Sequence, residues 1–121
     1  YVINYLAYSW IEKGTNIEQS LKMLEQANQL RSNDGYITDS LGWALYKLKK
    51  YKRAKEFLKK AVQLMPSDPI VNDHFADILW MNGEKLQARY YWKYVLNLEE
   101  VEDDLKDKIL KKILNGPVLF N

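Results

Sequence analysis

Residues 40–66 have the sequence SLGWALYKLKKYKRAKEFLKKAVQLMP, and this stretch decides the fold. In its first half the apolar residues recur three and four positions apart, which predicts a helix over 36–48. Beyond a lysine-rich link the same spacing returns and predicts a second helix over 51–65. Both helices carry small residues where their backbones could approach closely, at Gly42, Ala54 and Ala61.

The same pattern recurs along the chain. A shift of 34 residues places Ala54 on Ala88 and Leu58 on Trp92, and a shift back by 34 places Leu58 on Leu24. The first half of the first unit needs a shift of 35, so one extra residue lies in its turn. We therefore expect three two-helix units over residues 1–100, with approximate bounds of 1–34, 35–68 and 69–100.

Residues 101–121 leave the repeat. Apolar residues four positions apart, with lysines between them, predict one amphipathic helix with a stripe of Val101, Leu105, Ile109 and Ile113. Acidic residues at its start and lysines at its end suit the helix dipole, and 115–117 should end it. We expect this helix to cap the last repeat with a polar outer face, and Val118–Phe120 to pack back or to contact a neighbour.

Composition excludes several classes of function. The 121 residues, 47% hydrophobic and 28% charged, suit one compact domain or part of a longer array. The net charge of +2 gives no general reason to expect nucleic acid or a membrane surface, and no apolar run approaches the ~18 residues that span a bilayer. Without cysteine, and with His74 as the single histidine, thiol chemistry and histidine-rich metal sites are excluded. Because the chain begins with Tyr1, we expect it to be a fragment of a longer protein.

The order Thr38-x-x-Leu41-Gly42-x-x-Leu45, then Ala54-x-x-x-Leu58-x-x-Ala61, then Pro66, resembles the tetratricopeptide repeat (TPR). The resemblance implies an all-α fold: a right-handed α-solenoid of three TPR-like helix pairs plus a C-terminal capping helix. Thr38 and Asn72 depart from it, because the family favours a large aromatic residue there. Residues 4–10 and 39–43 further resemble the C-terminal repeats of bacterial TPR proteins, many of them envelope lipoproteins. That implies a bacterial envelope or periplasm and leaves the cytoplasm open.

In TPR proteins the first helix of each unit lines a concave groove where partners bind. Opposite the apolar stripes of these helices lie aromatic and acidic residues, which form the predicted partner-binding set: Tyr8, Asp39, Trp43, Tyr46, Asp73, Asp77 and Trp80. Aromatic residues with a polar atom are typical binding hot spots. The competing interpretation is that these rings fill gaps between neighbouring first helices.

The aspartates favour a basic or neutral partner over an acidic one. TPR domains that grip acidic C-terminal tails do so with Lys, Asn and Arg on their first helices. The matching positions here, which include no Lys or Arg, are Asn4, Tyr8, Ser40, Ile70 and His74. The sequence therefore predicts a protein-interaction adaptor or assembly scaffold that binds a peptide or protein partner and lacks this carboxylate clamp.

Two alternatives stay open. Residues 47–60 hold eight basic residues and one acidic residue, which would suit nucleic acid, although such a run is more often a solvated face. The chain could also be a structural module that stacks on upstream repeats or forms a homo-oligomer through Tyr1–Trp10 and Val118–Phe120.

Catalysis is not expected. His74 lies near Asp73 and Asp77, but the sequence has no nucleophile at a motif spacing and no glycine-rich phosphate loop. We expect no cofactor, no metal and no small-molecule substrate. In a solvated groove, Asp73 and Asp77 would keep ordinary pKa values.

Overall fold

The computed structural model describes residues 2–118, with side chains from residue 5 onward. This range contains helices and no strand, which confirms the all-α prediction. The helices are α1 (Val2–Lys13), α2 (Ile17–Leu30), α3 (Gly35–Lys47), α4 (Tyr51–Leu64), α5 (Pro69–Met81), α6 (Lys85–Leu96) and α7 (Asp103–Asn115). None of them is long and apolar enough to cross a membrane.

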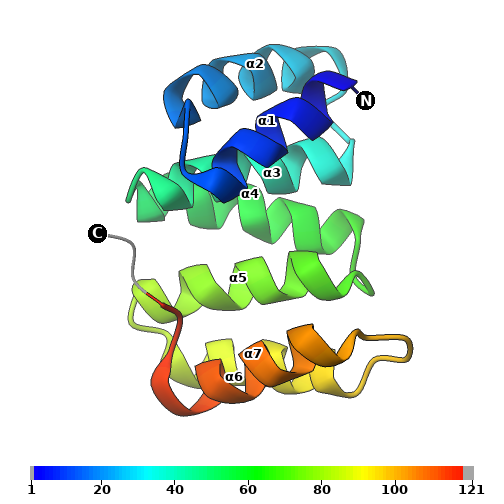
Figure 1. The fold of residues 1–121 in the computed structure, drawn as a ribbon, viewed down its shortest axis with the longest axis vertical. Coiled ribbons are helices and arrows are strands. Elements are labelled where there is room, and N and C mark those ends of the chain that lie inside the picture. Colours follow the sequence, from blue (N-terminus) through cyan, green and yellow to red (C-terminus); the bar gives the residue numbers. More distant parts are fainter. Residues whose placement is uncertain (1, 119–121) are drawn as a thin grey trace.

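The helices form a solenoid, as predicted. The pairs α1–α2, α3–α4 and α5–α6 stack along the long axis of the molecule, and α7 follows α6 at the end of the stack (Figure 1). The structure begins α3 one residue before the predicted helix and ends α4 one residue before the predicted end. Apolar spacing therefore located both helices of the central pair to within one turn.

Small residues let α3 and α4 pack closely. Ala54 and Ala61 are fully buried in α4. A Cβ placed on Gly42 would lie 2.7 Å from Cγ of Leu58 and 3.2 Å from its backbone nitrogen. The close approach that the small residues predict is therefore present, and it leaves no room for a larger side chain at Gly42.

The three first helices begin and end in similar ways. Asp34 caps α3 by accepting hydrogen bonds from the backbone N–H groups of Tyr36 (2.9 Å) and Ile37 (3.1 Å). Asp68 caps α5 by accepting from the backbone N–H of Val71 (3.0 Å). Each first helix ends in a turn that contains a residue at positive φ, namely Gly14 (71°), Lys49 (64°) and Gly83 (83°), and the turn after α1 contains a second one, Asn16 (52°). Two of the three first helices therefore end at a glycine with positive φ, whereas α3 ends before a lysine in this conformation.

The apolar stripe of α7 packs against the core. Ile109 is fully buried, and Leu105 and Ile113 pack beside it. The outer face is less polar than predicted, because Leu110 and Leu114 are 52% and 75% exposed. Tyr1 and residues 119–121, which include part of the predicted apolar tail, lie outside the described residues.

The turn after α7 holds the end of the helix against α5. Gly116 has a φ of 78°, and a Cβ on it would lie 2.4 Å from the indole ring of Trp80. Only glycine fits this close contact, so the predicted helix end at 115–117 also positions α7. Val118 beyond it is exposed.

Candidate partner-binding groove

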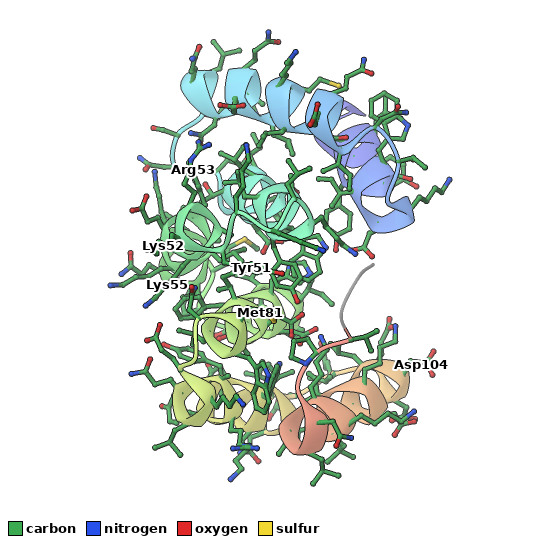
Figure 2. The ribbon with its side chains drawn as sticks, turned by 90° about the vertical axis from the view of Figure 1, so that its left-hand side faces the viewer. Tyr51, Lys52, Arg53, Lys55, Met81 and Asp104 are labelled. Carbon is green, nitrogen blue, oxygen red and sulfur yellow. The ribbon has the colours of Figure 1, made fainter. Side chains whose placement is uncertain are left out.

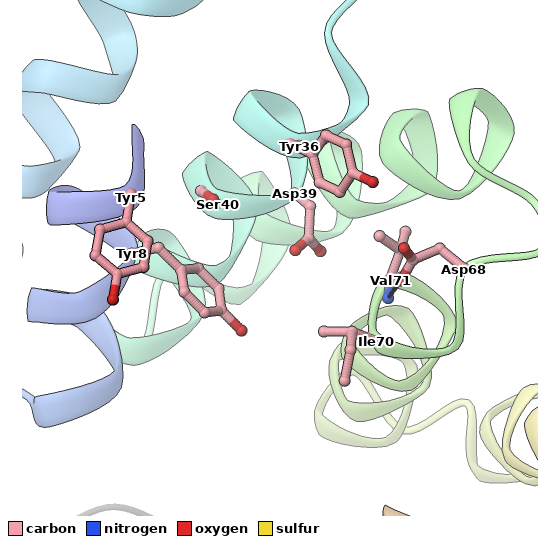
Figure 3. Close-up of a pocket in the computed structure, with 8 residues that line it drawn as sticks. All are labelled: Tyr5, Tyr8, Tyr36, Asp39, Ser40, Asp68, Ile70 and Val71. Carbon is pink, nitrogen blue, oxygen red and sulfur yellow. Dashed lines mark hydrogen bonds between the residues drawn. The ribbon is translucent and has the colours of Figure 1, made fainter. Parts of the chain in front are cut away.

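Two adjoining hollows form a groove along one face of the molecule. The first, here called the tyrosine hollow, has a volume of about 310 Å³ and is lined by Tyr5, Tyr8, Tyr36, Asp39, Ser40, Asp68, Ile70 and Val71 (Figure 3). The second, here called the lysine hollow, has a volume of about 560 Å³. It is lined by Tyr8, Glu12, Trp43, Lys47, Ile70, Asp73, His74, Asp77, Leu105, Lys108, Lys111, Lys112, Gly116, Pro117 and Val118. Tyr8 and Ile70 line both hollows, so the two are continuous across α1, α3, α5 and α7.

A stack of three buried rings lies beneath the groove. The rings of Trp43 and His74 are 3.8 Å apart and nearly parallel, and Tyr46 stacks on the other side of Trp43 at 4.6 Å. The indole N–H of Trp43 donates to a carboxylate oxygen of Glu12 at 3.2 Å, which ties α3 to α1. Trp43 and Tyr46 are 6% and 3% exposed, so most of their surface is core. The expectation that these rings lie open in a solvated groove is wrong for both.

Asp39 and His74 form a buried ion pair that joins α3 to α5. Nδ1 of His74 lies 3.0 and 3.1 Å from the two carboxylate oxygens of Asp39. Burial lowers the pKa of His74, but the carboxylate of Asp39 outweighs it, so that the pKa of the imidazole lies above its usual value. A raised pKa favours the protonated imidazole, which has no free lone pair with which to act as a base.

Lys112 of α7 reaches into α5 and binds two aspartates. Its Nζ donates to Asp73 at 2.9 Å and to Asp77 at 3.1 Å. The indole N–H of Trp92 also donates to Asp73, at 3.0 Å. The pKa of Asp77 is raised to about 7, chiefly by burial and next by the charge of Asp73, while Lys112 and His74 oppose both effects. The expectation that both carboxylates are solvated is wrong, because both are buried, and the ordinary pKa expected of Asp77 is wrong as well.

The predicted binding residues have different positions in this arrangement. Asp39, Trp43, Tyr46, Asp73 and Asp77 are buried, whereas Tyr8 and Trp80 are half-buried. Tyr46 and Trp80 line neither hollow. The other five line one or both hollows: Tyr8, Asp39, Trp43, Asp73 and Asp77. Their role in partner binding stays a prediction.

Trp80 packs within the chain. Its ring contacts Gly116, and the charged ends of Lys85 and Arg89 lie 4.9 and 5.0 Å from its centre. These contacts join α5, α6 and the turn after α7. We therefore assign Trp80 a structural part in docking α7.

Accessible residues of the groove were absent from the predicted set. Tyr36 and Ile70 are 59% and 40% exposed and line the tyrosine hollow. Lys108 and Lys111 are exposed and reach the lysine hollow from α7. The alternation of lysines with the stripe of α7 was visible in the sequence. Which side of α7 faces the groove depends on its packing against α6.

The basic run at 47–60 does not form one surface. Lys47 lines the lysine hollow, while Lys55 pairs with Glu84 at 2.6 Å and Lys60 donates to the carbonyl oxygen of Ser32 at 2.7 Å. Lys52 and Lys55 lie on the side of the molecule opposite α7 (Figure 2). Among the side chains that the structure describes, no three acidic, histidine or cysteine residues could hold a metal ion.

A comparison with known protein families finds a match to the central repeat of the chain. The tetratricopeptide repeat family matches residues 39–68. A TPR repeat-containing protein of Pseudomonas aeruginosa is 30% identical over 68 residues, which are 56% of this chain and 12% of that protein. The chain therefore matches only a small part of this relative.

Solved structures share the fold. The type III secretion translocator chaperone SycD of Yersinia enterocolitica superposes with a TM-score of 0.80 at 16% identity, over 93% of this chain and 79% of SycD. PcrH, solved with the chaperone binding region of PopD, gives 0.80 at 14% identity, over 94% of this chain and 87% of PcrH. The first TPR domain of human RPAP3 superposes with a TM-score of 0.78 at 16% identity, over 95% of this chain and 89% of that domain. The tetratricopeptide repeat family thus matches the central repeat, and the chain shares the fold of solved TPR proteins.

Proposed function

We propose that the chain is a non-catalytic adaptor that binds an extended segment of a partner protein along the groove of α1, α3, α5 and α7. The observation that carries the proposal is the continuity of the tyrosine and lysine hollows, which share Tyr8 and Ile70. A segment of several residues fits a continuous groove better than a small molecule does. Concave sites with exposed apolar side chains are typical binding sites.

The floor of this groove is preorganised. The stack of Tyr46, Trp43 and His74, together with the ion pair of His74 with Asp39, fixes α3 against α5. Little ordering of the protein is then needed when a partner binds, which favours affinity.

Proteins of the same fold bind peptides. SycD has been solved in complex with a peptide of the translocator YopD, at 17% identity to this chain. The first TPR domain of Spaghetti (RPAP3) has been solved bound to an HSP90 peptide, at 15% identity. At these identities the likeness is one of fold, and it supports peptide binding as a general activity of the proposed groove.

The test compares two exposed aliphatic residues. A displayed peptide library is selected on the wild-type chain, and the affinity of each selected peptide is remeasured with Ile70→Ala and with Leu86→Ala. Ile70 lines both hollows, whereas Leu86 is exposed on α6 and lines neither. We expect Ile70→Ala to weaken binding at least about fivefold and Leu86→Ala to leave it unchanged. Equal effects of the two variants would contradict the proposal.

Self-association is the second candidate. Leu86 of α6 and Leu110 and Leu114 of α7 are 82%, 52% and 75% exposed at the end of the helix stack. If these leucines mediate assembly, light scattering will show a molecular mass that rises with protein concentration. A variant with all three leucines replaced by serine will then have the mass of a monomer. A monomer at all concentrations would exclude this candidate.

A further inference from the structure

The groove's three aspartates are already engaged within the chain. Asp39 is paired with His74, and Asp73 and Asp77 share Lys112. Glu12 accepts the indole N–H of Trp43. The sequence prediction of a basic or neutral partner assumed three aspartates open to a ligand, and this premise is wrong because the structure buries all three.

The lysine hollow instead presents two lysines of α7, Lys108 and Lys111, that have no ion pair with the side chains that the structure describes. Both lysines are exposed. Lys47 lies beside them with its Nζ 5.4 Å from the ring centre of Trp43. Burial lowers the pKa of Lys47, the carboxylates of Glu12 and Asp77 oppose this effect, and the charge of Lys112 adds a smaller lowering. A negatively charged ligand would relieve this repulsion.

The tyrosine hollow has the opposite character. Its two carboxylates are engaged, since Asp39 pairs with His74 and Asp68 caps α5. Tyr5, Tyr36 and Ile70 remain exposed around it (Figure 3). Aromatic and aliphatic walls of this kind favour an apolar side chain.

We propose that the groove selects a bipartite segment, with an apolar side chain in the tyrosine hollow and neighbouring acidic residues at Lys108 and Lys111 in the lysine hollow. This inference rests on the proposed peptide-binding function and specifies the chemistry of the partner. It differs from a carboxylate clamp on the first helices, because the cations that are open to a ligand come from α7.

The probes are short synthetic peptides that combine one leucine with a block of glutamates at varied spacing, in both orders. Matched series carry lysines or serines in place of the glutamates. Fluorescence anisotropy with the full chain gives the affinities. We expect glutamate peptides to bind at least about tenfold more tightly than lysine peptides, and the difference to shrink as salt rises.

Two charge-reversal variants locate the effect. Lys108→Glu with Lys111→Glu changes the lysine hollow, whereas Lys22→Glu with Lys93→Glu makes the same change of charge at exposed positions of α2 and α6 outside both hollows. We expect the first pair of substitutions to weaken the binding of glutamate peptides at least about tenfold. The second pair should change their affinity by less than about twofold.

The outcomes separate the two proposals. If lysine peptides bind as tightly as glutamate peptides, or if both variant pairs act equally, while Ile70→Ala still weakens binding, the bipartite partner is overturned and the groove function stands. If no peptide binds, or if Ile70→Ala leaves every affinity unchanged, the groove function fails and the bipartite partner fails with it.

Discussion

Lys49 has a backbone conformation that is unfavourable for a lysine. A glycine adopts the same conformation at almost no cost in free energy. The φ of Lys49 is 64°, and the equivalent turns after α1 and α5 use Gly14 and Gly83. We expect Lys49→Gly to raise the free energy of unfolding by about 0.5–1 kcal/mol, measured by urea denaturation. Lys50→Gly, at a φ of −91°, serves as the control and should lower it. A loss of stability in Lys49→Gly would contradict this assignment.

Gly42 gives the converse case, in which a better helix former should destabilise. Alanine is favoured over glycine within a helix by about 1 kcal/mol. At Gly42 the added Cβ would collide with Leu58, so we expect Gly42→Ala to lower the free energy of unfolding by about 1–3 kcal/mol. Gln63→Ala, at an exposed position of α4, should change it by less than about 0.5 kcal/mol. An unchanged midpoint in Gly42→Ala would show that α3 and α4 are less closely packed.

Asp77 should make the chain less stable as the pH rises. Because burial raises its folded-state pKa to about 7, from 3.8, the folded state binds this proton more tightly than the unfolded state. The resulting stabilisation is full at low pH and is lost as the pH rises through about 7. His74 acts in the same direction, since its pKa is also raised. The groups that face Asp77 are Asp73 and His74 of α5, Lys112 of α7, and Tyr46 and Lys47 of α3.

We therefore expect the free energy of unfolding to fall between about pH 5 and about pH 8. Asp77→Asn, which cannot titrate, should have a shallower slope over this window. Urea denaturation at a series of pH values gives both slopes. Identical slopes in the two proteins, or a wild-type stability that rises with pH, would contradict the raised pKa.

At the scale of elements, Lys112 adds two ion pairs to the apolar packing that docks α7. Lys112→Met would leave Asp73 and Asp77 buried without their cation, so we expect a loss of about 3–5 kcal/mol. Faster amide hydrogen exchange should be confined at first to α7 and its contacts with α5 and α6. Lys111→Met, one position earlier and exposed, is the matched control and should be nearly neutral. Equal effects of the two variants would show that α7 docks by its apolar stripe alone.

The sequence predicted elements better than it predicted burial. Apolar spacing located α3, α4 and the stripe of α7, because each depends on residues close together in the chain. The burial of Trp43 and Tyr46 could not be obtained in this way. They lie opposite the stripe that faces α4, yet the adjacent first helix contributes His74, which stacks on Trp43.

The charges of the groove were misjudged for a related reason. Asp73 and Asp77 lie one turn apart on α5, and that spacing was visible in the sequence. Their cation is 39 and 35 residues away, respectively, and reaches them only when α7 folds onto α5 and α6. Contacts between residues so far apart in the chain cannot be derived from local periodicity.

At the scale of the whole molecule, four helices build the proposed binding surface, and α7 is one of them. It contributes Lys108 and Lys111 to the groove and neutralises the aspartates of α5 through Lys112. The helix that was predicted as a cap is therefore also part of the proposed site. Its loss should remove both stability and the preference for acidic segments.

One NMR titration tests the central claim most directly. The chain, labelled at the indole nitrogens and the isoleucine methyl groups, is titrated with the tightest leucine–glutamate peptide. If the groove is the binding site, the signals of Ile70 and Trp43 will shift with the peptide, while Ile17 on α2 will stay in place. A shift at Ile17, with Ile70 and Trp43 unmoved, would contradict the account.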